Sequence, residues 1–258
     1  MPIEFYKYQG TGNDFIMIDN RLLQFSKNNT KLVATLCDRK FGIGADGLIL
    51  LEDHPEYDFK MVYYNSDGNL SSMCGNGGRC LVQFARFLGI IKHEATFEAV
   101  DGLHFARILE NNWVSLGMND VKEVRQETGY VFLDTGSPHH VQLVENVTAF
   151  DVVSEGRNIR HDIYGKAGAN VNFVTPLSDN SFRVRTYERG VENETLSCGT
   201  GVTAVALAMY TLGKTTAKNV TLETPGGTLQ ITFEPKEGHF EKVFLNGPAL
   251  QVFKGTWA

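Results

Sequence analysis

Short apolar runs separated by glycine-rich turns fill the first quarter of the chain. Alternating apolar and polar residues predict a strand over 5–8, and a continuous apolar run predicts another over 15–18. Residues 10–13, between them, have the composition of a turn. A second glycine-rich turn at 42–47 leads into another apolar run, and residues 57–64 again have the pattern of a strand. This part of the chain is therefore expected to form a sheet.

Two segments have the pattern of helices instead. Apolar residues recur at helical spacing between Leu81 and Leu88, which predicts a helix over about 77–88 that ends at Gly89. Residues 201–212 form the second segment and are apolar on almost every side. A helix of that kind is expected to be enclosed by other structure, because it has no polar face for water.

The chain repeats its glycine-rich landmarks at one constant offset. Cys74 and Cys198 each precede a Gly-x-Gly sequence, and their separation is 198 − 74 = 124 residues. The glycines that close the two predicted helices, Gly89 and Gly213, differ by 213 − 89 = 124. Two upstream pairs keep the same offset: Gly12-Asn13 with Gly136-Ser137, and Gly44-Ala45-Asp46 with Gly168-Ala169-Asn170. With the cysteine and its Gly-x-Gly sequence counted separately, these are five landmarks at one offset, which indicate two copies of one structural unit.

These patterns predict an α/β fold of the α+β type. We expect two pseudo-symmetric domains, each a curved, mostly antiparallel sheet around a central helix, with the active site in the cleft between them. The first copy is expected over 1–112 and the second over 113–249. Residues 250–258 lie beyond the second copy and are expected to return and complete the first.

Composition narrows the classes of function. The net charge is 24 − 30 = −6, and the opposite charges are interspersed, so neither nucleic acid nor an anionic membrane surface is an expected partner. No stretch approaches the roughly 20 apolar residues of a membrane-spanning helix, and no signal peptide is visible. Four cysteines in 258 residues are too few for a disulfide scaffold. The sequence therefore favours a cytoplasmic protein with free thiols.

Both repeated cysteines lie in a setting that favours an anion. Cys74 and Cys198 come just before a predicted helix start, where unpaired backbone N–H groups and the helix dipole stabilise negative charge. A thiol there is expected to ionise below its ordinary pKa of about 8.5. The flanking glycines let backbone amides approach a bound carboxylate closely. Two such thiols facing each other would suit a reaction that needs an acid and a base on opposite faces of one carbon.

Other polar residues in the neighbouring loops fit an amino-acid ligand. Glu188 and Arg189, shortly before Cys198, offer one charge of each sign to an ammonium and a carboxylate. Side-chain amides bind both groups without adding net charge. The candidate asparagines in these loops are Asn13, Asn65, Asn76 and Asn170.

Several residues have simpler interpretations. A lone cysteine is most often a small buried apolar residue, and Cys37 and Cys80 keep that interpretation. Neither Cys74 nor Cys198 has a second ligand at the spacing of a metal site, and no nucleotide-binding motif is present. His139 and His140 are either a polar strand start or part of the site. The remaining histidines, His104 among them, are scattered and are expected to be solvated.

With these motifs in view, the sequence resembles the cofactor-independent diaminopimelate epimerases. The matching motifs cover the chain in order and are specific as a set: Gly12-Asn13-Asp14-Phe15, Asn65-x-Asp67-Gly68, Cys74-Gly75-Asn76-Gly77-x-Arg79-Cys80, Pro138-His139, Glu188-Arg189-Gly190, and Glu194-Thr195-Leu196-Ser197-Cys198-Gly199-Thr200-Gly201.

The resemblance implies an isomerase that interconverts LL- and meso-2,6-diaminopimelate, on the route to lysine and peptidoglycan, with no cofactor and no metal. It implies that Cys74 and Cys198 are the two acid/base residues, and that His139 and Glu188 tune the thiols. The residues that the resemblance assigns to substrate binding are Asn13, Asn65, Gly75, Asn76, Asn170, Glu188, Arg189, Gly199 and Thr200.

The chain departs from the common family pattern at three places. Many members carry a glutamine where this chain has Gly47, and an asparagine where it has Ser137. The loop 191–193 is one residue longer than the common glycine-rich form. None of these departures touches the two cysteines.

Three other functions are alternatives to a diaminopimelate epimerase. A proline or hydroxyproline racemase shares the chemistry, but Glu188 and Arg189 suit an open-chain centre with a free ammonium. A non-catalytic relative is disfavoured because both cysteines are present. A thiol redox or metal protein is disfavoured by the cysteine spacing. The expected partner is a small amino-acid substrate, and a homodimer is the assembly considered.

Overall fold

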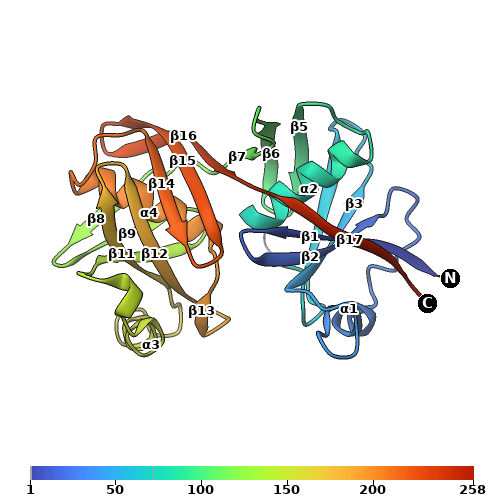
Figure 1. The fold of residues 1–258 in the computed structure, drawn as a ribbon, viewed down its shortest axis with the longest axis horizontal. Helices are drawn as coiled ribbons and strands as arrows, with labels where there is room; N and C mark the ends of the chain where they lie inside the picture. The colour runs from blue at the N-terminus through green and yellow to red at the C-terminus, as the bar shows by residue number, and fades with distance from the viewer. Residues whose placement is uncertain (1, 72) are drawn as a thin grey trace. The chain divides into compact units, whose positions relative to one another are not determined.

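The computed structural model describes residues 2–71 and 73–258. Contacts divide the chain into two compact units. Unit 1 comprises Met1–Leu116 and Gly247–Ala258, and unit 2 comprises Gly117–Asn246. The chain thus leaves unit 1, builds unit 2 and returns to unit 1 for its last residues (Figure 1).

Unit 1 is a mostly antiparallel sheet with two helices. Its helices are α1 (Thr30–Cys37) and α2 (Gly75–Phe87). Its strands are β1 (Ile3–Gly10), β2 (Asn13–Asp19), β3 (Gly47–Glu52), β4 (Phe59–Asn65), β5 (Glu94–Ala99), β6 (Gly102–Ile108), β7 (Val114–Gly117) and β17 (Leu250–Trp257). The two parallel pairs, β2 with β3 and β4 with β5, are each joined through a helix, because parallel neighbours need a crossover connection.

Unit 2 repeats this arrangement. Its helices are α3 (Val152–Asp162) and α4 (Gly199–Thr211), with a short 3-10 turn η1 (Val147–Ala149). Its strands are β8 (Val124–Glu127), β9 (Tyr130–Asp134), β10 (Pro138–Leu143), β11 (Asn170–Ser178), β12 (Ser181–Glu188), β13 (Asn193–Thr195), β14 (Asn219–Thr224), β15 (Gly227–Lys236) and β16 (His239–Gly247). The parallel pairs are again two, β10 with β11 and β12 with β14.

The repeat is most evident in helices α2 and α4. Each has 13 residues and begins directly after a cysteine. Each ends before a leucine, Leu88 or Leu212, and the following Gly89 and Gly213 both have positive φ, 74° and 64°. The expected starts, 77 and 201, were two residues late, because the glycines were interpreted as turns.

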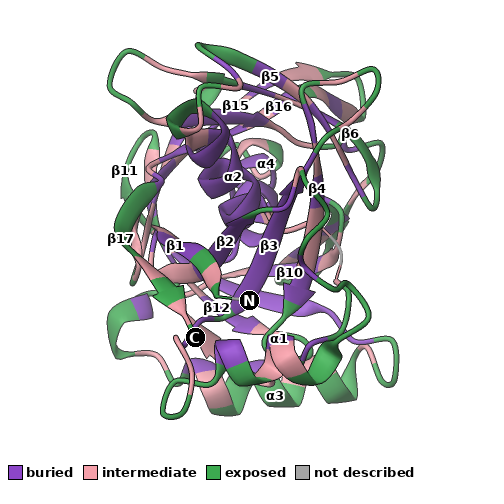
Figure 2. Cartoon of the chain, turned by 90° about the vertical axis from the view of Figure 1, so that its right-hand side faces the viewer, coloured by how far each residue is buried: buried purple, intermediate pink, exposed green. Residues whose placement is uncertain are grey.

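Both helices lie among strands rather than at a surface. Most of α2 and α4 is buried (Figure 2). In α4 this holds from Val202 through Met209, on every side of the helix, as its apolar composition predicted. Glycines near the start of α2 allow this burial. A Cβ at Gly77 would lie 2.8 Å from Ile49 Cδ1 and one at Gly78 2.8 Å from Met73 Cε.

The C-terminal strand pairs with the first strand. β17 runs antiparallel to β1, with Ile3 opposite Trp257 and Gln9 opposite Leu250, and the two lie side by side in Figure 1. In unit 2 the corresponding partner of β9 is β8, which precedes it in sequence. The same position in the two sheets is therefore filled from opposite ends of the chain.

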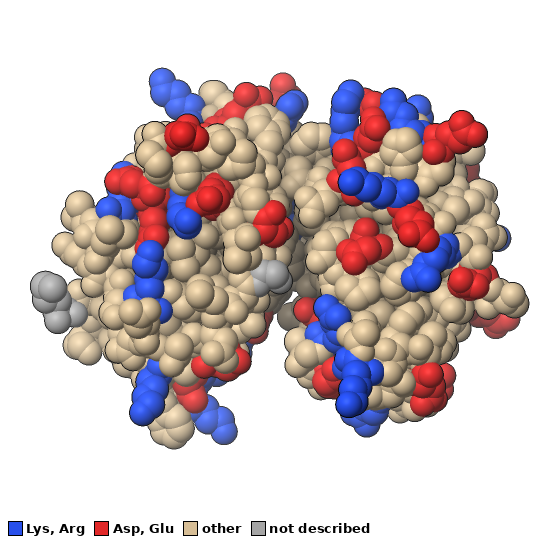
Figure 3. Space-filling view, turned by 180° about the vertical axis from the view of Figure 1, so that it is seen from behind, with Lys and Arg blue, Asp and Glu red and all other residues tan. Residues whose placement is uncertain are grey.

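Charges of both signs are mixed on the surface. Figure 3 shows Lys and Arg beside Asp and Glu on the visible face of each unit. Pairs such as Arg183 with Glu223, 2.8 Å apart, account for part of this mixing. One expectation about the histidines is wrong: His104 is buried, stacked on Phe97, and its Nε2 lies 3.0 Å from Asp101 Oδ1. Among the described residues, no helix is both long and apolar enough to cross a membrane.

The burial of α4 generates a stability prediction. Leu207→Ala should lower the free energy of unfolding by about 2–5 kcal/mol, because Leu207 is wholly buried and its removal leaves a cavity. Leu250→Ala is the matched control. Leu250 is 57% exposed, so the change should be within about 0.5 kcal/mol. Urea denaturation measures both, and equal losses would contradict the description of α4 as the core of unit 2.

Candidate active site

Cys74 occupies the N-cap of α2. Its backbone is extended, with φ −108° and ψ 122°, so the first N–H groups of the helix are left without carbonyl partners within the helix. The Cys74 Sγ lies 3.5 Å from Asn13 Oδ1, at the start of β2. Asn76 Nδ2 donates to the same oxygen at 3.3 Å. These three residues, with Gly75 as the first residue of the helix, form what we call the unit 1 half-site.

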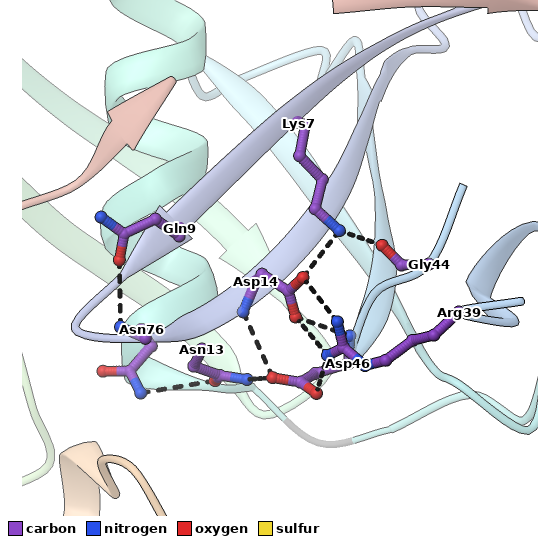
Figure 4. Close-up of polar contacts among 9 residues, drawn as sticks. Lys7, Gln9, Asn13, Asp14, Arg39, Gly44, Asp46 and Asn76 are labelled. Atoms are coloured by element: carbon purple, nitrogen blue, oxygen red, sulfur yellow. Dashed lines mark hydrogen bonds and ion pairs between the residues drawn. The ribbon is translucent and has the colours of Figure 1, made fainter. Parts of the chain in front are cut away.

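A charged network fixes the orientation of Asn13 (Figure 4). Asn13 Nδ2 donates to Asp46 Oδ2 at 2.6 Å, which turns Oδ1 toward Cys74 and Asn76. Arg39 binds both Asp46 and Asp14, and Lys7 pairs with Asp14 at 2.7 Å. Burial acts to raise the pKa of Asp14, but its bonds with Arg39 and Lys7 outweigh this and hold the pKa at about 2. Asp14 therefore stays ionised at neutral pH.

A buried arginine hydrogen-bonds the side chain of Asn76. Arg79 is fully buried, and its guanidinium donates to Asn76 Oδ1 at 3.0 Å and to Thr11 Oγ1 at 3.4 Å. Burial lowers the pKa of Arg79 to about 10, which still leaves it charged at neutral pH. The Asn76 amide is therefore held between Arg79 and Asn13.

Asn65 lies at the exposed end of β4. It opens a tight turn, in which its backbone N–H donates to Asn69 O and its carbonyl accepts from Gly68 N, both at 3.0 Å. Strand pairing places Asn65 opposite Gly47, and Gly47 opposite Phe15, two residues beyond Asn13. Asn65 thus belongs to the same end of the unit 1 sheet as Asn13.

Cys198 occupies the equivalent N-cap in unit 2. Its φ and ψ are −119° and 112°, close to those of Cys74. The Cys198 Sγ lies 3.4 Å from Thr200 Oγ1, and Thr135 Oγ1 donates to Thr200 O at 2.9 Å. A Cβ at Gly201 would lie 3.2 Å from the Cys198 Sγ and 2.5 Å from Asn172 Oδ1, so this position requires glycine.

His139 is buried between two asparagines of β11. Asn172 Nδ2 lies 3.1 Å from His139 Nδ1, and Asn170 Nδ2 lies 3.5 Å from Nε2. Burial, with a smaller effect of the Arg189 charge, lowers the pKa of His139 from 6.5 to about 3. The imidazole is therefore neutral at physiological pH. His140 is also buried, and its ring stacks on Tyr130 on the opposite face of β10, while its backbone carbonyl accepts from Asn172 Nδ2 at 2.9 Å.

Asn170 connects His139 to Arg189. The Arg189 N–H donates to Asn170 Oδ1 at 2.9 Å. Ser137 Oγ accepts from both side chains, from Asn170 Nδ2 at 3.2 Å and from Arg189 at 3.4 Å. Glu188, half-buried, ends β12 directly before Arg189. We call this set, with Cys198, Gly199 and Thr200, the unit 2 half-site.

The structure thus brings most of the expected site residues of each unit together within that unit. Sequence reasoning missed Asn172, Asp46, Arg39 and Arg79 as supports. Strand alternation offered a signal for Asn172 alone, since it shares a face of β11 with Asn170. The other two cysteines agree with their interpretation as buried residues: burial raises the pKa of Cys37 and of Cys80 to about 12. Within residues 2–71 and 73–258, no three His, Cys, Asp or Glu residues are placed to hold a metal ion.

The buried neutral imidazole predicts a pH dependence of stability. The pKa of His139 is depressed in the folded state, so the unfolded chain binds the proton more tightly. The His139 contribution is therefore complete above about pH 6.5 and is lost as the pH falls toward about 3, by at most about 1.4 kcal/mol per pH unit. His139→Gln should flatten that part of the curve. Urea unfolding at several pH values measures this, and parallel curves for the two proteins would contradict it.

The chain is similar to known proteins over nearly its whole length. A family model described as diaminopimelate epimerase matches residues 5–123 and 131–251. The diaminopimelate epimerase of Flavobacterium psychrophilum is 60% identical over 255 residues, which cover 98% of this chain and 100% of that protein. The diaminopimelate epimerase of Aquifex aeolicus is 42% identical, with 98% and 97% covered.

Solved structures share the fold at much lower identity. A PhzF-family phenazine biosynthesis protein of Bacillus anthracis matches with a TM-score of 0.80 at 13% identity, over 100% of this chain and 99% of that one. A hydroxyproline epimerase of Agrobacterium vitis matches with a TM-score of 0.72 at 15% identity, over 100% and 92%. These two likenesses concern the fold alone. The family model covers most of the chain and the curated relatives cover nearly all of it, so this chain belongs to the diaminopimelate epimerase family of isomerases.

Proposed function

We propose that this protein interconverts LL- and meso-2,6-diaminopimelate by a cofactor-independent, two-base proton transfer at one α-carbon. One observation carries the proposal: two helices of equal length present a cysteine at the same N-cap position, one in each unit. Each cap places a sulfur beside the first backbone N–H groups of a helix. The proposal requires both half-sites to act on the same substrate molecule.

The chemical problem is the weak acidity of the α-proton. In the proposed step, a thiolate takes this proton, and the electron pair of the C–H bond is delocalised into the neighbouring carboxylate. The other cysteine, as a thiol, then protonates the carbon from the opposite face. Afterwards the two cysteines have exchanged protonation states, so the reverse reaction uses them in exchanged roles. Neither step consumes an oxidant, a metal or an electron carrier.

Backbone amides at the two helix starts are proposed to stabilise the developing charge. The amides after each cysteine, at Gly75 and Asn76 and at Gly199 and Thr200, point from a helix N-terminus, where an anion is favoured. Donors fixed in place before the reaction lower its barrier most, because they need no reorganisation.

The charged and amide side chains are proposed to bind the rest of the substrate. Arg189 is assigned to a carboxylate and Glu188 to an ammonium. Asn13, Asn65 and Asn170 provide further hydrogen bonds. His139 is proposed to position Asn170 and Asn172 as a neutral imidazole, and through them to influence the thiols without adding charge. Such an enzyme is proposed to act in the cytoplasm and to supply a precursor of lysine and peptidoglycan.

The direct test is solvent exchange. Reduced protein incubated with LL-diaminopimelate in heavy water should form the meso isomer and incorporate deuterium at the α-carbon, with a chelator present and no cofactor added. Mass spectrometry and NMR measure both. Turnover of proline or hydroxyproline instead would favour the racemase alternative, and loss of turnover with chelator would contradict the mechanism.

The two cysteines should be separable by stereochemistry. Cys74→Ala or Cys198→Ala should nearly abolish epimerisation, because one face then lacks its proton donor or acceptor. Elimination from an analogue with a leaving group beside the α-carbon needs proton removal alone. Cys74→Ser should therefore keep elimination with one stereoisomer, and Cys198→Ser with its mirror image. Cys37→Ala is the matched control and should keep epimerisation. Loss of the same isomer in both serine variants would contradict the two-base assignment.

Arg189 gives a separate prediction. Arg189→Ala should lower kcat/KM by about tenfold to more than a hundredfold, the range for removing a charged hydrogen-bond donor. Steady-state kinetics with LL-diaminopimelate measures this. Arg183→Ala is the control, since Arg183 pairs with Glu223 on the surface. A near-normal kcat/KM for Arg189→Ala would remove this residue from the proposed site.

A further inference from the structure

Tyr63 and Tyr64 are neighbours on β4, but their side chains lie in different surroundings. Tyr64 is buried in the core of unit 1 and donates its hydroxyl to Lys27 O at 3.1 Å. Tyr63 points to the opposite face of β4, because successive side chains alternate, and it is half-buried. That face of β4 is the one that carries Met61 and Asn65.

This face is covered by the first turn of α2. A Cβ on Gly77, in that turn, would lie 2.8 Å from Ile49 Cδ1, 3.4 Å from Phe15 Cε1 and 3.5 Å from Met61 Cε. The Phe15 and Tyr63 rings meet edge to face, with centroids 5.9 Å apart. Tyr63 therefore lies on the side of the sheet that faces the helix capped by Cys74.

The ring of Tyr63 leans over Gly47. A Cβ at Gly47 would lie 2.5 Å from Tyr63 Cε2, 3.1 Å from its hydroxyl and 2.5 Å from Tyr64 O, so a side chain at 47 and this ring position exclude each other. Gly47 is paired with Asn65 and with Phe15. The phenol thus extends along the sheet toward the end that carries Asn13 and Asn65.

Tyr63 also borders open space. This hollow of about 520 Å³ is bordered as well by Met73, the residue directly before Cys74. A half-buried tyrosine that borders open space is a typical ligand contact, since it combines apolar area with a hydroxyl that can donate or accept.

We propose that Tyr63 is a specificity-determining residue of the unit 1 half-site, whose hydroxyl hydrogen-bonds the bound diamino acid, and that Gly47 is glycine to make room for its ring. This inference rests on the proposed function. It also explains the glycine at position 47, where many family members carry a glutamine. The hydrogen-bonding group that a glutamine would provide is supplied by Tyr63 from the adjacent strand.

The first experiment removes the hydroxyl alone. Tyr63→Phe should raise the KM for LL-diaminopimelate by about tenfold, with kcat changed by less than about twofold and Tm unchanged, because the ring packing remains. Tyr64→Phe is the matched control on the opposite face, where KM should stay at the wild-type value. A Tyr63→Phe enzyme with wild-type KM would overturn the contact with substrate.

The second experiment tests the exclusion between the two positions and needs no activity. Gly47→Gln should lower Tm, because its Cβ collides with the Tyr63 ring and with Tyr64 O, and Gly47→Gln combined with Tyr63→Val should recover the part of the loss that is due to the ring. The double variant should also recover part of the KM. Wild-type Tm for Gly47→Gln alone would overturn the ring placement. If the wild-type protein itself fails to exchange the α-proton, the proposed function fails, whereas the Tm comparison still decides the packing of Tyr63 against Gly47.

Discussion

Each unit is built around a buried helix, and the first backbone N–H groups of that helix have no hydrogen-bond partners within it. In α2 and α4 this end is not capped by an oxygen from Ser, Thr, Asp or Asn, the usual solution. A cysteine stands there instead, and neither cysteine makes a side-chain capping bond. The first N–H groups of each helix therefore depend on partners outside the helix. The strands around each helix bury most of its length, including most of its first turn.

Much of the fold could be predicted from the sequence because glycines recur at the same offset in its two halves. Gly89 and Gly213 need positive φ, so their spacing reported a shared backbone rather than a shared set of side chains. The helix starts were harder to predict. Gly77 and Gly78 have the composition of a turn, yet they lie inside α2, where a Cβ would come within 2.8 Å of the side chains of Ile49 and Met73. Composition alone cannot separate a glycine that bends the chain from one that admits a neighbour.

The candidate site residues could be proposed from the sequence where they stand in motifs, but their supports could not be predicted where the fold brings distant segments together. Cys74, Cys198 and Arg189 stand in recognisable motifs. Asp46 and Arg39 hold Asn13 from segments more than 20 residues away, and no local pattern announces such a contact. The repeat also conceals a difference between the halves. Arg79 lies buried near the start of α2, whereas the position 124 residues later is Thr203, which donates to Gly199 O at 2.9 Å. The two helices therefore have the same backbone conformation but differ in the charge that is buried near their first turn.

The pairing of β17 with β1 has a consequence for how the protein is made. Ribosomes release a chain from its N-terminus, so unit 2 is complete in sequence before the last strand of unit 1 has been synthesised. Until those final residues emerge, β1 has an open edge on the side that β17 will cover, and open edges invite pairing with other chains. The nascent protein must therefore hold its first-made unit unfinished while the second one folds. A stalled or prematurely ended translation product would contain the whole Cys74 segment and still lack the strand that closes its sheet.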